Sequence, residues 1–247
     1  MTAIAAIARK ELALYFGSVT FYALTAVFLA LAGYFFYGNV GFFVLMGGMN
    51  LARGLWQWQL FDLERLLLAL VPLLTMRLFA EERKLGTLEL LWTYPVRDVE
   101  IIAGKFVACL GVVTLMLAGT LLYPAILAVY HPVNPGPLVA GYLGLWLFAA
   151  AFVACGLAVS ALTDSQLVAG VTTYGVLLFL WMITWNEAAV NATARSVLLP
   201  LSMFDRFQVF ALGAVDTKDV VYLVLFSATF LTLTFFALEA RRWRGVR

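Results

Sequence analysis

Long, uninterrupted runs of hydrophobic residues dominate the chain, and short polar segments separate them. A helix needs about 20 mostly apolar residues to cross roughly 30 Å of hydrocarbon. Six segments meet this requirement: residues 19–45, 60–79, 101–130, 137–162, 166–185 and 220–240. Strands of a membrane barrel would instead alternate between apolar and polar positions. The pattern therefore predicts an all-α integral membrane protein, with six transmembrane helices in a single domain over residues 1–247.

The second of these segments is the least apolar. Asp62, Glu64 and Arg65 occupy its first turns, and Pro72 interrupts it. Asp62 and Arg65 are three positions apart, a spacing that allows a local ion pair. We favour a pair near the outer membrane surface over a substrate contact, because such side chains reach the interface readily. The spans carry few other ionisable groups, which argues against a proton- or sodium-coupled carrier.

Composition supports the membrane assignment. Hydrophobic residues make up 64% of the chain and charged residues only 12%, whereas soluble domains carry about 25% charged residues. A water-soluble globular protein is therefore excluded. The net charge of +2 gives no indication of nucleic-acid binding. Cys109 and Cys155 both fall inside predicted spans, so no disulfide framework is expected and packing roles are favoured.

The basic residues indicate how the chain is oriented. An even number of spans places both termini on one side of the membrane. Eleven of the 16 basic residues then lie on that side, at positions 9, 10, 77, 83, 84, 97, 105, 241, 242, 244 and 247. Because cytoplasmic segments are enriched in Lys and Arg, we expect cytoplasmic termini in a multi-pass protein of the inner (plasma) membrane.

The polar segment between the second and third spans, residues 80–100, has the most informative pattern. It begins with the charged string Glu81 to Lys84, and Gly86 then allows a sharp change of direction. One apolar stripe of a short helix follows, at Leu85, Leu88, Leu91 and Trp92. Two interpretations remain: a solvated loop with an interfacial turn, or an amphipathic helix that docks a cytoplasmic partner.

The string EERKLGTLELLWTYPV at residues 81–96, with Gly104-Lys105-Phe106 after it, resembles the cytoplasmic loop of type-2 ABC transporter permeases. It is most similar to the gliding-motility-type branch, and the copper-maturation type is also similar. Residues 7–12 resemble the opening amphipathic helix of that family. The segment from Phe204 to Tyr222 resembles the approach to the sixth span in that branch. Together these matches extend over most of the chain.

The resemblance implies a half-transporter that pairs with a second permease copy or a paralogue and binds a cytoplasmic ABC ATPase subunit. It also implies an interfacial helix over residues 1–18, a coupling helix after the second span, and accessory membrane or periplasmic partners. The residues implied at the ATPase contact are Glu81, Glu82, Arg83, Gly86, Thr87 and Glu89, and those on the interfacial helix are Arg9, Lys10 and Glu11. The basic tail at residues 241–244 is typical of binding to anionic membrane lipid.

The outer segment at residues 186–219 is too long for a turn and too short for two further spans. A re-entrant or interfacial hairpin fits it, because irregular backbone is tolerated at membrane depth where protein covers it. In type-2 ABC exporters this position resembles the helices that close the outer gate. The residues implied there are Pro200, Asp205 and Arg206.

The chain has no glycine-rich phosphate loop. We therefore expect ATP and Mg to bind the partner ATPase, and we expect no cofactor in this chain. An intramembrane enzyme is disfavoured, because its chemistry needs a nucleophile facing a base inside the bundle. The lone His131 lies in a predicted outer loop. With one His and two separated Cys residues, the sequence predicts no metal site. The leading interpretation is therefore the permease of an ABC-2 type exporter, and the alternative is a non-transporting scaffold subunit of a membrane complex.

Overall fold

The computed structural model describes residues 3–46, 51–87, 96–130, 134–183 and 202–244, and side chains at 51–53 and 241–244 are not described. Among these residues all regular secondary structure is helical, as predicted. The helices are α1 (Ala3–Phe16), α2 (Val19–Leu45), α3 (Leu51–Thr75), α4 (Ala80–Lys84), α6 (Asp98–Thr120), α7 (Leu122–Tyr130), α8 (Pro135–Leu162), α9 (Gln166–Met182), α11 (Met203–Ala211) and α12 (Thr217–Arg244).

Four stretches of the described chain are long and apolar enough to cross a membrane. They are α2, α6 together with α7, α8, and α12 as far as Ala240. Helix α3 has the length but carries Asp62, Glu64 and Arg65 near its middle, and α9 has only 17 residues. Helix length and composition therefore support four spans and do not by themselves establish the predicted six.

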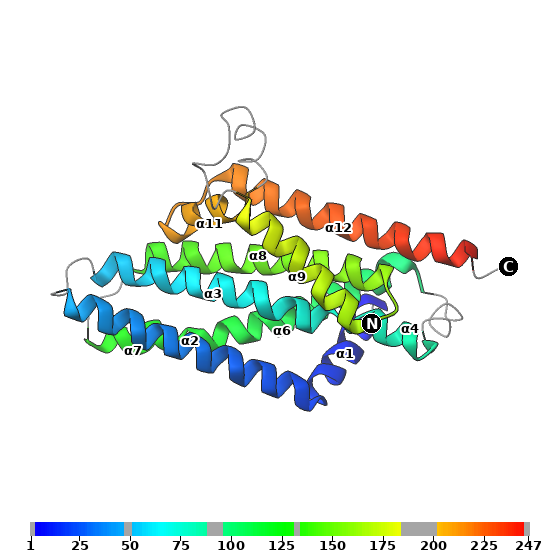
Figure 1. Ribbon diagram of the computed structural model, residues 1–247, viewed down its shortest axis with the longest axis horizontal. Helices are drawn as coiled ribbons and strands as arrows, with labels where there is room; N and C mark the ends of the chain where they lie inside the picture. The colour runs from blue at the N-terminus through cyan, green and yellow to red at the C-terminus, as the bar shows by residue number, and fades with distance from the viewer. Residues whose placement is uncertain (1–2, 47–50, 88–95, 131–133, 184–201, 245–247) are drawn as a thin grey trace.

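Helix α8 lies at the centre of the bundle, with α3, α6, α9 and α12 packed along it (Figure 1). Small residues make this close packing possible. A Cβ atom added at Gly156 would overlap Thr75 of α3, and one at Gly144 would lie 2.6 Å from the Phe210 Cβ of α11. Helix α3, which carries charged residues, and α9, which is apolar but short, thus both pack on the span-like helix α8.

The two ends of the bundle differ in their elements. Helices α1 and α4 and the C-terminal part of α12 lie at one end, and α7 and α11 lie at the other (Figure 1). Helix α1 is separated from α2 by Gly17 and Ser18 and packs on α6. Its inward face carries Ala8, Glu11 and Tyr15 at the spacing of one helical stripe. We call the end that holds α1 and α4 the α1 end.

Candidate functional site

A buried lysine connects three segments at the α1 end. Lys105 of α6 is 1% exposed. Its Nζ donates to Glu11 Oε1 at 2.9 Å and to the Leu78 carbonyl at 2.8 Å. The same amine forms an ion pair with Glu82 Oε1 at 3.0 Å. Burying an ammonium group is costly unless acceptors surround it, and here α1, α4 and the turn after α3 each supply one.

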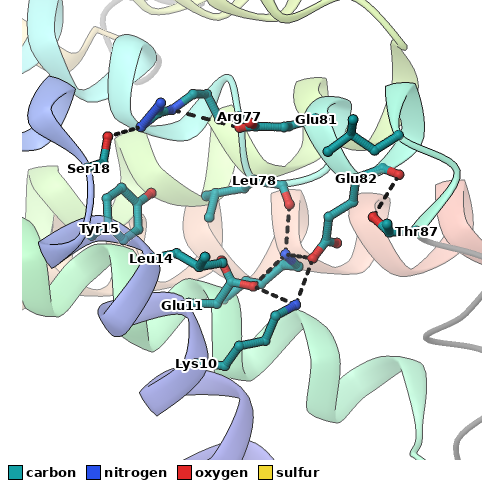
Figure 2. Close-up of a pocket in the computed structure, with 12 residues that line it drawn as sticks. Lys10, Glu11, Leu14, Tyr15, Ser18, Arg77, Leu78, Glu81, Glu82 and Thr87 are labelled. Carbon is teal, nitrogen blue, oxygen red and sulfur yellow. Dashed lines mark hydrogen bonds and ion pairs between the residues drawn. The ribbon is translucent and has the colours of Figure 1, made fainter.

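Lys10 completes this group of charges (Figure 2). Its Nζ lies 3.2 Å from Glu82 Oε1 and 3.8 Å from Glu11 Oε1, and half of its side chain is exposed. Two amines and two carboxylates therefore alternate, and the formal charges cancel. We call Lys10, Glu11, Glu82 and Lys105 the charge cluster. The ring of Phe79 adds a cation–π contact, with its centroid 5.2 Å from the Lys105 Nζ.

A cavity of about 400 Å³ opens beside the charge cluster. Its lining includes Tyr15, Ser18 and Arg77 as well as the cluster. The Arg77 guanidinium donates to Ser18 Oγ at 3.1 Å and lies 4.0 Å from the Glu81 carboxylate. Tyr15 donates its hydroxyl to the Leu74 carbonyl at 3.0 Å. Burial raises the pKa of Tyr15 well above its ordinary value, so this hydroxyl remains a donor.

The start of α4 is held by a residue of α8. The backbone N–H groups of Phe79 and Ala80 both donate to Ser160 Oγ at 3.1 Å, and that hydroxyl donates to the Met76 carbonyl at 3.1 Å. The first N–H groups of a helix have no partner within the helix. A side chain from another helix therefore provides the cap that the local sequence lacks.

A second contact joins α4 to the connection between α8 and α9. Arg83 Nη1 donates to the Thr163 carbonyl at 2.9 Å and pairs with Asp164 at 3.2 Å. The Arg83 side chain is only 4% exposed. Beyond α4, Gly86 has φ of +70°, a left-handed conformation that commonly ends helices and that glycine adopts without strain. The predicted change of direction at Gly86 is confirmed.

The residues predicted at the ATPase contact fall into two groups. Glu82 and Arg83 direct their charged groups into the protein, whereas Glu81 has 45% of its side chain exposed. Gly86 is exposed, with open space where a Cβ would lie. Thr87 donates its hydroxyl to the Glu82 carbonyl at 3.1 Å. Glu89 and the remainder of the predicted coupling helix, residues 88–95, lie outside the described residues.

The residues predicted on the interfacial helix also separate by exposure. Arg9 and Lys10 are exposed on α1. Glu11 is 5% exposed and belongs to the charge cluster. Lys105 entered the predictions only as a basic residue on the cytoplasmic side and as part of the family resemblance, and no role was predicted for Ser160. A lysine within an otherwise apolar run was the available signal for the first, and no local signal marks the second.

At the opposite end, the predicted outer-gate residues Asp205 and Arg206 lie on α11, and Pro200 is outside the described residues. Arg206 Nη1 pairs with Asp219 of α12 at 2.7 Å. Its guanidinium also lies 3.9 Å from the centroid of the Tyr222 ring. Helix α11 therefore joins α12 through a shielded ion pair, besides packing on α3, α8 and α9.

The charges of α3 have partners on other helices. The predicted pair between Asp62 and Arg65 is confirmed at 2.9 Å, and Asn39 of α2 donates to Asp62 at 2.9 Å. Glu64 is fully buried, and Trp181 of α9 donates its indole N–H to Glu64 Oε2 at 3.0 Å. Within the described part of the chain, no cluster of His, Cys, Asp and Glu could hold a metal ion.

Comparison with known families supports the resemblance found in the sequence. Residues 5–242 match the model of the ABC-2 family transporter proteins. Among curated proteins, none matches the chain significantly. The family match begins within α1 and ends in the last turn of α12. Together with the apolar helices it indicates a multi-pass membrane protein. The chain belongs to the ABC-2 family of transporter proteins.

Proposed function

We propose that the chain is the permease subunit of an ATP-driven ABC-2 type exporter. In this proposal two permeases form the translocation pathway, and a separate cytoplasmic ATPase binds ATP and Mg. The observation that carries the proposal is the anchoring of α4 at the α1 end. Helix α4 is short, lies at the end of the bundle, and has charged groups tied to α1, α6 and the α8–α9 connection. This arrangement suits transmission of force from a docked motor.

The exposure of α4 and the following turn supports this assignment. Glu81, Lys84 and Leu85 present accessible surface, and Leu85 is 68% exposed. The charged groups of Glu82 and Arg83 lie on the inward side. A partner that binds the outer surface would therefore press on a helix whose inner side is fixed to α1, α6 and the α8–α9 connection.

The topology follows from the same arrangement. In the proposed six-span arrangement α3 and α9 also cross the membrane, and both pack on the apolar span α8. Basic residues gather at the α1 end, among them Arg9, Lys10, Arg77 and Lys84. By the positive-inside rule we expect this end to lie in the cytoplasm, where an ATPase would meet α4. Membership of the gliding-motility-type branch and the accessory partners remain part of this proposal.

Affinity purification in mild detergent from native membranes, with mass spectrometry of the bound proteins, tests the proposal. We expect a soluble subunit with a phosphate loop to copurify with the native chain. Leu85→Asp and Gly86→Pro should release it, since the first places a charge on the contact surface and the second cannot adopt a positive φ. Leu212→Asp is the matched control, because Leu212 is 59% exposed at the opposite end.

Two results would argue against this function. Recovery of the native chain alone, or only with other membrane proteins, would favour a scaffold. Retention of the ATPase by both Leu85→Asp and Gly86→Pro, with normal stimulation of its activity, would show that the turn after α4 is not the contact.

A further inference from the structure

We propose that Lys105 is a positioning residue that transmits movement of α4 to α1, so that α1 is a moving part of the coupling mechanism. This inference rests on the proposed function, because it requires an ATPase that acts on α4. It assigns to α1 a role beyond lying on the membrane surface.

The geometry gives Lys105 a singular position among the described residues. Its ammonium group is the buried donor shared by Glu11 of α1 and Glu82 of α4, at 2.9 and 3.0 Å. The other charged link between these helices passes through Lys10, which is half exposed. Exposed ion pairs contribute little to holding two elements together. The buried amine is therefore the stronger connection between α1 and α4.

Close backbone packing fixes α1 to the same point of α6. A Cβ atom at Gly104 would lie 2.7 Å from Ile7 Cγ2 and 3.2 Å from the Ile4 carbonyl. The glycine thus lets α1 approach α6 directly beside Lys105. Helix α1 cannot slide across this crossing without losing both the close contact and the bond to Glu11. Displacement of Glu82 will consequently carry α1 with it.

Burial of the ammonium group makes each of its ion pairs costly to break. Removing one partner from a buried ion pair leaves an uncompensated charge in an apolar surrounding. Glu11 and Glu82 share the buried ammonium group of Lys105, so withdrawal of either carboxylate leaves that group with fewer acceptors. An apolar side chain at position 105 would fill the same space but would not oppose sliding of α1 past α4.

Helix α4 has a second set of contacts that does not involve α1. Ser160 and Arg83 tie α4 to α8 and to the α8–α9 connection. Loss of the Lys105 connection should therefore leave α4 in place while uncoupling the movement of α1 from it. This separation allows the role of Lys105 to be measured apart from docking of the ATPase.

The experiment measures whether α1 moves when the ATPase is trapped. Spin labels are placed at Ala6 of α1 and Leu233 of α12, both exposed, in the complex of the chain with its copurified ATPase. Cys109 and Cys155 are fully buried and stay unlabelled. Electron–electron double resonance measures the distance between the two labels without nucleotide and after trapping with ATP and vanadate. We expect the distance distribution of the native chain to shift on trapping.

The variants separate positioning from simple structural support. Lys105→Met and Glu11→Ala should keep the bound ATPase and lose the shift at Ala6. Lys105→Arg retains a charged donor and should restore the shift. Arg9→Gln is the matched control, because Arg9 is exposed on the same helix, and the shift should be unchanged. Glu11→Ala leaves Lys105 paired with Glu82 and serves as the test if Lys105→Met fails to assemble.

Two results would overturn the inference: a native complex in which trapping does not shift the distance, or a Glu11→Ala complex that keeps its ATPase and its full shift. Failure of the native chain to copurify with any ATPase is a different outcome. It would refute the proposed function, and this inference with it.

Discussion

Replacing Ser160 with alanine removes one hydroxyl that joins α8 to the start of α4. The hydroxyl accepts hydrogen bonds from the backbone N–H groups of Phe79 and Ala80 and donates to the Met76 carbonyl, each at 3.1 Å. Phe79 and Ala80 are both 0% exposed, so water does not readily replace the lost acceptor. The substitution hardly changes the side-chain volume and keeps the helical preference of α8. Its effect on the free energy of unfolding therefore comes mainly from the lost hydrogen bonds.

The expected loss follows from the two orphaned donors. Each buried N–H without a partner costs about 1–3 kcal/mol. We expect Ser160→Ala to lower the free energy of unfolding by about 2–4 kcal/mol, because the short helix α4 can shift enough to relieve part of the cost. Ser227→Ala is the matched control. The Ser227 hydroxyl only donates to the Leu223 carbonyl of its own helix, so its loss should cost no more than about 0.5 kcal/mol.

The assay is equilibrium unfolding of both variants in mixed micelles with increasing sodium dodecyl sulfate, followed by tryptophan fluorescence. The reasoning would be refuted if the free energies of unfolding of Ser160→Ala and Ser227→Ala differed by less than about 1 kcal/mol. So small a difference would mean that α4 is held at the bundle by other contacts and that its cap from α8 has little energetic weight.

The other two predictions concern Tyr15 and Arg206. Burial raises the pKa of Tyr15, so above about pH 10 this hydroxyl ionises first in the unfolded chain, and the free energy of unfolding should fall as pH rises. In unfolding titrations Tyr15→Phe should lose less of this free energy at alkaline pH than the native chain. An equal dependence on pH in the two proteins would contradict this. Arg206→Met leaves Asp219 without its 2.7 Å partner and should cost about 1–3 kcal/mol. In the same assay Lys218→Met, at an exposed position, should cost about 0.5 kcal/mol or less, and equal losses would show that the Arg206 pair has no net effect.

The hydrophobic pattern was sufficient to predict the main helices, because burial in an apolar medium requires continuous apolar runs. The first predicted span, residues 19–45, coincides with α2, and the fourth ends with α8 at Leu162. The second was predicted to begin at residue 60, whereas α3 begins at Leu51. The first turns of α3 carry Arg53, Gln57 and Gln59, and these polar residues lower the local hydropathy enough to hide the start of the helix.

The candidate site was less accessible to sequence reasoning. The charged string from Glu81 was recognised, but the sequence does not show which of its members turn inward. Glu82 meets Lys10 and Lys105, which are 72 and 23 positions away in the chain. Such partners are set by the crossing of α1 and α6 and cannot be read from local periodicity. The turn at Gly86 was predictable, because glycine is the residue that tolerates a positive φ.

The buried carboxylate of α3 has a consequence for membrane insertion. In the proposed six-span arrangement α3 crosses the membrane, and its Glu64 finds a donor in Trp181, which follows it by 117 residues. At about 5–20 residues per second, a ribosome needs roughly 6–23 s to synthesise that interval. During this time α3 carries a carboxyl group without its donor, which disfavours lipid, and Asn39 of α2 is already available to Asp62. Helix α3 should therefore leave the insertion machinery late, paired with α2, and reach its final depth only when α9 arrives.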